Sequence, residues 1–144
     1  MLAVIAALGV ISAYQCAEQY FVSNQMTIEQ YEQDPQSMLG PLGIEHGSFQ
    51  QFLFEHRLYS RGVRGFFTTR NSAGSFALMA LFAAIALFID KLRHRRFGAS
   101  GLWYLLGCGF GIAVILFGLG LTRSKGAMIG LFFAVAAFFL FLLL

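Results

Sequence analysis

The sequence has few charged residues, few prolines and few cysteines. Only 12% of its 144 residues are charged, roughly half of the ~25% typical of soluble domains, so the composition belongs to the membrane class. The basic residues are scattered between apolar segments, which argues against nucleic-acid binding. The two cysteines, Cys16 and Cys108, lie in different apolar runs and show no metal-ligand spacing. We therefore expect no disulfide, no metal and no cofactor.

Apolar residues make up 58% of the chain. They gather in four runs, at residues 1–14, 71–89, 102–121 and 127–144. A spanning helix needs about 20 mostly apolar residues, and these runs lack the alternation of barrel strands. The sequence therefore predicts an all-α, polytopic transmembrane protein with about four spanning helices. Its expected parts are a first helix at 1–14, an outer loop at 15–70 and three transmembrane helices within 71–144.

The first and last runs predict that the chain is a fragment of a larger protein. The first run is short for a span and lacks the positive start and clear cleavage site of a signal peptide. We interpret it as a spanning helix whose beginning is lost. The last run carries no charge up to the final residue. We expect such a fragment to be inactive alone.

The charges of the connecting segments predict the orientation in the lipid bilayer. Four basic residues lie within positions 91–96, so the positive-inside rule places the loop 91–98 in the cytoplasm. The loop 15–70 then lies outside, with six acids and four arginines for a net charge of −2. The turn with Arg123 and Lys125 also lies outside, where the rule does not favour cations. Misplaced cations of this kind often mark a functional site.

The outer loop is expected to contain one amphipathic helix near 48–61. Ser48 and Gln51 have the spacing of a capping box, and aromatic residues follow on one side. On another side, three arginines recur at i, i+4 and i+7, namely Arg57, Arg61 and Arg64. We interpret this segment as a helix lying in the outer interface. Residues 15–47 contain breaking prolines and glycines and are expected to lack regular structure.

Four groups of residues are candidates for a site on the outer side of the membrane. Arg57, Arg61, Arg64 and Arg70 could grip a lipid diphosphate in a bidentate way, or simply bind ordinary phospholipid headgroups. Asn71 is expected to cap the second span, whose N-terminus would also attract anions. The turn 122–126 combines two cations with two hydroxyls, or is only a hairpin with interfacial anchors. His46 and His56 could act as a general base, although no partner is identifiable.

Two stretches resemble the O-antigen ligase and O-antigen polymerase family. Residues 64–74, RGFFTTRNSAG, resemble its signature R…G-x-F-x-x-x-N-x-x-[AG]. Residues 121–127, LTRSKGA, resemble its motif L-T-x-S-R-[GS]-A. One helical hairpin separates the two stretches, and the resemblance covers about residues 50–144.

The resemblance implies a glycosyltransferase of the GT-C kind in the bacterial inner membrane, with the loop 15–70 in the periplasm. Such enzymes of lipopolysaccharide and cell-envelope biosynthesis transfer a glycan from undecaprenyl diphosphate to lipid A–core, another glycan or a protein, without a metal. Outer arginines stabilise the departing diphosphate. The expected diphosphate contacts are Arg61, Arg64, Arg123 and Lys125. The expected supporting residues are Asn71, Ser124, Arg57 and Arg70.

The sequence departs from the family at two points. Lys125 stands where the family usually has arginine, which keeps the charge but loses the fork geometry. The family's catalytic histidine lies on a large outer loop further along, so the catalytic residue of this chain is unknown. The alternative is a non-catalytic membrane protein, such as a transporter fragment or an assembly subunit. The third run, 102–121, is rich in glycine and uncharged, which favours close helix packing over transport.

Overall fold

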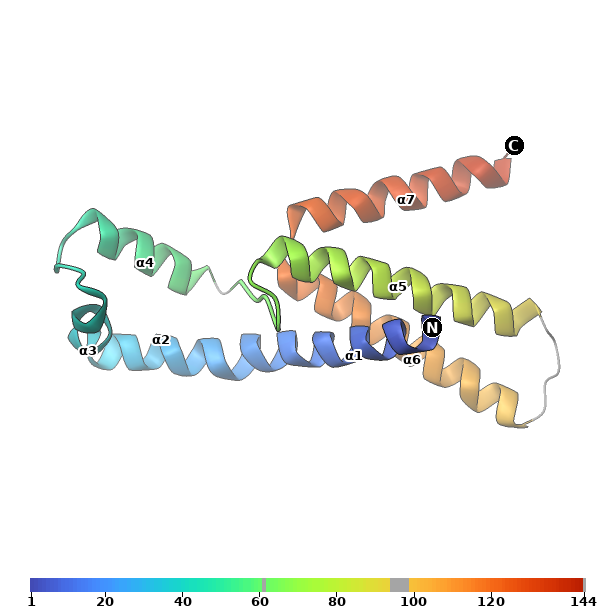
Figure 1. Cartoon of the computed structure of the whole chain (residues 1–144), viewed down its shortest axis with the longest axis horizontal. Coiled ribbons are helices and arrows are strands. Elements are labelled where there is room, and N and C mark those ends of the chain that lie inside the picture. The colour runs from blue at the N-terminus through green and yellow to red at the C-terminus, as the bar shows by residue number, and fades with distance from the viewer. Residues whose placement is uncertain (61, 94–98, 144) are drawn as a thin grey trace.

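The computed structural model describes residues 1–60, 62–93 and 99–143, and no strand occurs among them. The predicted all-α fold is therefore confirmed (Figure 1). The helices are α1 (Leu2–Glu18), the π-helical turn η1 (Gln19–Ser23), α2 (Asn24–Gln33), α3 (Pro35–Leu39), the 3₁₀ turn η2 (Gly40–Leu42), α4 (Phe49–Tyr59), α5 (Arg70–Arg93), α6 (Ala99–Thr122) and α7 (Lys125–Leu143).

Three of these helical stretches are long and apolar enough to cross a membrane. They are Leu2–Gln33, Arg70–Arg93 and Gly101–Thr122. α1, α5 and α6 pack on one another as a bundle, whereas α7 packs mainly on α5 and otherwise stands apart (Figure 1). The apolar part of α7, Lys125–Leu140, falls short of the length of the other three. The structure thus supports three of the four expected spans.

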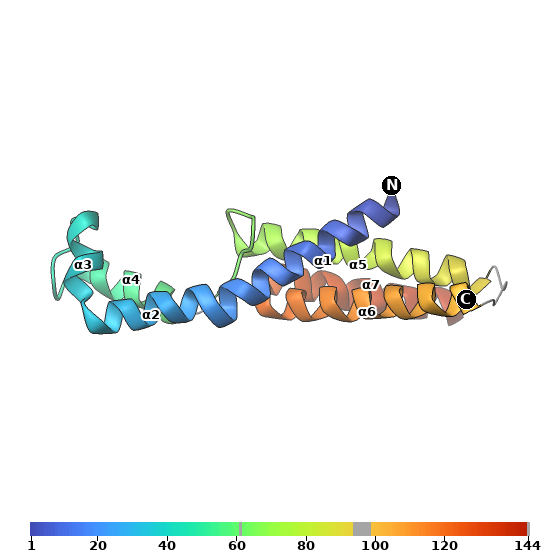
Figure 2. The same ribbon diagram turned by 90° about the horizontal axis from the view of Figure 1, so that it is seen from below.

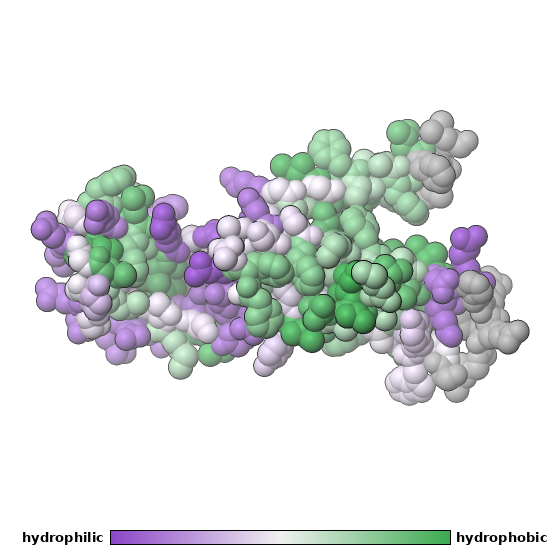
Figure 3. All heavy atoms as spheres, in the orientation of Figure 1, coloured by the Kyte–Doolittle hydropathy of each residue, from purple (hydrophilic) through white to green (hydrophobic). Residues whose placement is uncertain are grey.

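Small residues hold the bundle together. Gly9 of α1 faces Ala80 of α5 so closely that a Cβ at Gly9 would overlap the Ala80 methyl group. A Cβ at Gly118 of α6 would lie 2.5 Å from the Ala13 Cβ of α1. Large side chains such as Phe110 point outward, and hydrophobic residues cover the bundle and α7 in Figure 3. Small residues inside and large apolar residues outside are the arrangement that suits helices surrounded by lipid.

The first helix does not end near residue 14. α1, η1 and α2 form one continuous rod from Leu2 to Gln33 (Figure 2), so the expectation of irregular structure from residue 15 onward is wrong. Most residues of α2 are polar, yet most of them favour a helix. The rod ends only at Asp34, whose carboxylate accepts the backbone N–H groups of Gln36 and Ser37 and so caps α3. The change to polar residues after position 14 marks the end of the apolar stretch but not the end of the helix.

α4 occupies most of the region predicted as an amphipathic helix. Its N-cap is Ser48, whose Oγ accepts the backbone N–H of Gln51 at 3.2 Å. The helix ends at Tyr59, so Arg64 does not continue its arginine face, and the predicted i, i+4, i+7 row does not form. Arg61 lies outside the described residues.

α4 stands beside α2 instead of lying across the end of the bundle (Figures 1 and 2). The Tyr31 hydroxyl donates to Glu55 Oε1 at 2.7 Å, and Gln51 Nε2 donates to the same oxygen at 2.9 Å. The Tyr31 and Phe54 rings are 5.6 Å apart. These contacts hold α4 alongside α2, and its position in the outer interface stays a prediction. We call α2, α3 and α4 together the arm.

Candidate functional site

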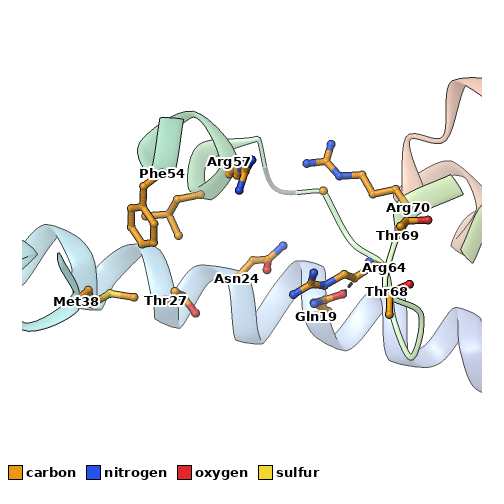
Figure 4. Close-up of a pocket in the computed structure, with 12 residues that line it drawn as sticks. Gln19, Asn24, Thr27, Met38, Phe54, Arg57, Arg64, Thr68, Thr69 and Arg70 are labelled. Atoms are coloured by element: carbon orange, nitrogen blue, oxygen red, sulfur yellow. Dashed lines mark hydrogen bonds between the residues drawn. The ribbon is translucent and has the colours of Figure 1, made fainter. Parts of the chain in front are cut away.

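A hollow of about 580 Å³ lies where the arm meets the end of the bundle (Figure 4). Three arginines line it: Arg57 from α4, Arg64 from the segment between α4 and α5, and Arg70 from the first turn of α5. The other lining residues that the structure describes are neutral. We call this site the arginine hollow. A concave site with cations and no carboxylate in its wall concentrates positive potential and attracts anions.

The three arginines are held to different degrees. Arg70 Nη2 donates to Ser60 Oγ at 2.7 Å, and its guanidinium lies against Gly62, where any side chain would overlap it. Arg57 and Arg64 are exposed, and no ion pair with a carboxylate is formed by any of the three within the described chain. Their charges are therefore available to a ligand, with Arg70 fixed in advance.

A glutamine of the rod holds Arg64 at the hollow. Gln19 Oε1 accepts the backbone N–H of Arg64 at 2.9 Å and that of Gly65 at 3.0 Å. Gly65 has a left-handed φ of 55° and lies against Cys16 of α1, while Val63 is fully buried. Gln19 begins the π-helical turn, and such turns frequently occur at functional sites. Nothing in the sequence pattern marked Gln19.

The start of α5 differs from the prediction for Asn71. Thr69 is the N-cap, because its Oγ1 accepts the Ser72 N–H at 3.1 Å and its carbonyl accepts the Ala73 N–H at 3.2 Å. Asn71 lies inside the helix. Its Oδ1 instead accepts a hydrogen bond from Ser124 Oγ at 3.1 Å. The predicted capping role of Asn71 is therefore wrong, and the residue joins α5 to the turn before α7.

Ser124 connects that turn to two helices. Its Oγ accepts the Ala127 N–H at 3.3 Å and its carbonyl accepts the Met128 N–H at 3.0 Å, so Ser124 caps α7. A Cβ at Gly74 would lie 2.6 Å from the Ser124 Cβ, which explains why α5 has glycine there. The two stretches of the family resemblance thus touch through Asn71, Gly74 and Ser124.

The predicted cations divide into two groups at this end of the bundle. Arg57, Arg64 and Arg70 share the arginine hollow, whereas Arg123 and Lys125 do not line it. Arg123 adopts a left-handed φ of 49°, and both side chains of the turn are exposed. Of the expected principal contacts that the structure describes, Arg64 lines the hollow and Arg123 and Lys125 do not, while Arg61 lies outside the described residues. The supporting residues Arg57 and Arg70 also line the hollow. The neighbours Arg70 and Asn71 bond to different partners, Ser60 and Ser124, and this separates the two groups.

Other chemical groups are sparse around the hollow. Neither His46 nor His56 lines it. In the described part of the chain, no three His, Cys, Asp or Glu side chains gather as metal ligands would. The arrangement is thus suited to holding an anion through guanidinium groups.

Comparisons with protein-family models, curated proteins and solved structures find no match to this chain. The function is therefore argued from the chain's own residues.

Proposed function

We propose that the arginine hollow binds the diphosphate of a glycan carried on undecaprenyl diphosphate. In this proposal the chain belongs to a glycosyltransferase of the O-antigen ligase kind, which transfers the glycan to lipid A–core, another glycan or a protein at the periplasmic face of the bacterial inner membrane. One observation carries the proposal: three arginines that pair with no carboxylate among the described residues line one hollow at the end of apolar helices.

The chemistry of transfer needs positive charge at this place. The bond between the sugar's anomeric carbon and the diphosphate oxygen breaks, and the electron pair leaves with the diphosphate. The acceptor hydroxyl forms the new bond to the anomeric carbon and releases its proton to water, so that the diphosphate carrier and one proton are the other products. Guanidinium groups stabilise the negative charge that develops on the leaving oxygens. Arg70 is already positioned by Ser60, so little reorganisation is needed there.

The position of the hollow also fits a lipid-linked ligand. Arg64 and Arg70 lie where the arm joins α1 and α5, next to surfaces apolar enough to face lipid (Figure 3). A diphosphate held there leaves its isoprenyl chain free to run along the bundle. Because Arg123 and Lys125 lie outside the hollow, they are not proposed as principal contacts of the diphosphate.

The proposal is tested by isoprenyl diphosphate binding to the full chain in phosphatidylcholine nanodiscs. Farnesyl diphosphate is the probe, and farnesol is the uncharged control ligand. Each charge-assisted hydrogen bond contributes about 1.5–3 kcal/mol, so we expect Arg57→Gln and Arg64→Gln each to weaken binding by about tenfold or more. Arg93→Gln, at the other end of α5, is the matched control and should bind as the wild type does.

Three results would contradict the proposal. One is wild-type binding of farnesyl diphosphate no tighter than that of farnesol. Another is equal loss for Arg64→Gln and Arg93→Gln. If phosphatidylglycerol displaces the probe at equal concentration, the hollow is a general headgroup site and its role in transfer is refuted.

A further inference from the structure

The arginine hollow has two chemically different ends. Arg64 and Arg70 lie at the end next to the bundle, together with Thr68 and Thr69 (Figure 4). The opposite end lies within the arm, where Arg57 of α4 stands beside the neutral residues Asn24, Thr27 and Phe54 (Figure 4). Its volume of about 580 Å³ falls within the ~300–1,000 Å³ of sites for drug-sized ligands. A diphosphate group alone occupies only part of such a space.

The position of the membrane determines which part of a carrier reaches the arm. An isoprenyl chain remains in contact with the apolar surface of the bundle, on one side of Arg64 and Arg70. In a carrier-linked glycan, the first sugar is attached to the other end of the diphosphate. With the diphosphate at these arginines, the first sugar therefore extends away from the bundle and into the arm, toward Asn24 and Phe54 (Figure 4).

The arm end offers the groups that a sugar needs. The Asn24 carboxamide is half-buried, points into the hollow (Figure 4) and makes no hydrogen bond within the described residues. It can both donate to and accept from sugar hydroxyls. The Thr27 hydroxyl donates to the Ser23 carbonyl at 2.7 Å and retains acceptor capacity. Phe54 supplies an aromatic surface against which the C–H groups of a sugar ring can pack.

We propose that this end of the hollow is a subsite for the first sugar of the carrier-linked glycan, with Asn24 as a specificity-determining residue and Phe54 as its apolar wall. The inference rests on the proposed function, since it assumes that the arginines hold the diphosphate. It assigns the arm, which the family resemblance covers only in part, a role in substrate recognition.

The test compares farnesyl diphosphate with its glucosyl and N-acetylglucosaminyl forms, bound to the full chain in nanodiscs. We expect at least one sugar form to bind the wild type about tenfold more tightly than the bare diphosphate, the effect of about one well-placed hydrogen bond to a neutral group. Asn24→Leu and Asn24→Ala should abolish this preference while leaving the affinity for bare farnesyl diphosphate within about twofold. Gln25→Leu changes an exposed amide of the same helix outside the hollow, and should keep the preference.

The outcomes distinguish a failure of the sugar subsite from a failure of the diphosphate site. Tight binding of the bare diphosphate with no preference for either sugar form overturns the sugar subsite and leaves the diphosphate site standing. A preference that survives both Asn24 variants overturns the role of Asn24. Binding of neither ligand overturns both proposals. Circular dichroism of each variant verifies that the helices are intact.

Discussion

Replacing Ser124 with alanine should weaken the attachment of α7 to the bundle. The change removes two hydrogen bonds of the Oγ atom, to Asn71 Oδ1 at 3.1 Å and from the Ala127 N–H at 3.3 Å. Loss of an N-cap costs about 1 kcal/mol, and a hydrogen bond between membrane helices contributes about 0.6 kcal/mol on average. The sum of about 1.6 kcal/mol corresponds to a shift of roughly tenfold in the folding equilibrium.

The assay is equilibrium unfolding of the full chain in mixed micelles with increasing dodecyl sulfate, followed by circular dichroism. Ser75→Ala is the matched control, because Ser75 is exposed on α5 and its hydroxyl makes no hydrogen bond within the described residues. Asn71→Ala should lose only the interhelical bond. The double variant should show a coupling of about 0.6 kcal/mol between Asn71 and Ser124.

The reasoning fails if Ser124→Ala costs no more than Ser75→Ala. It also fails if the effects of the Asn71 and Ser124 variants simply add, because the contact between the two stretches would then contribute nothing. Ser124→Thr keeps the hydroxyl, but its added methyl group meets the tight approach of Gly74. It is therefore not a suitable rescue variant.

Two further predictions concern the arm and the hollow. The hydrogen bond from Tyr31, followed by that from Gln51, lowers the pKa of Glu55 below its ordinary value of 4.5. This carboxylate therefore stabilises the arm above pH 4.5 and ceases to do so as the pH falls through its lowered pKa. Spin labels on α2 and α4 should move apart in the wild type as the pH is lowered. Glu55→Gln should remove this pH-dependent separation. The prediction is contradicted if the labels in Glu55→Gln still move apart as they do in the wild type. Gln19→Met removes the acceptor of two backbone N–H groups. Hydrogen exchange at the Arg64 amide should therefore accelerate about tenfold. Equal exchange rates in the variant and the wild type would refute the role of Gln19 in holding Arg64.

Much of the helical frame could be predicted from the sequence. Long apolar runs specify the spans, and a helical hairpin returns the chain to the side from which it started, so α5 necessarily begins near the end of α6. The S-x-x-Q spacing at Ser48 correctly marked the start of α4. These features depend on local patterns, and local patterns are visible in a single chain.

The composition of the site was less predictable, because it depends on contacts between distant segments. Gln19 is 45 residues from Arg64, and no local pattern connects them. The arginines near α4 were assigned to one helical face, yet the helix ends at Tyr59, and only tertiary structure brings Arg70 back beside Ser60. Asn71 is a residue type common at N-caps, but Thr69 takes that place, and the Asn71 amide is used between helices.

The unbroken rod from Leu2 to Gln33 links the depth of the protein in the bilayer to the height of the hollow. Its 32 residues span about 48 Å at ~1.5 Å per residue, whereas the hydrocarbon layer measures about 30 Å. An untilted rod of this length therefore projects at least ~18 Å beyond the hydrocarbon layer. The bundle packs on α1 (Figure 1), so the projecting end is α2, which carries Asn24. A thinner membrane tilts such a rod further and swings the far tip sideways relative to the headgroups. The geometry of the arginine hollow is therefore expected to depend on the thickness of the lipid bilayer.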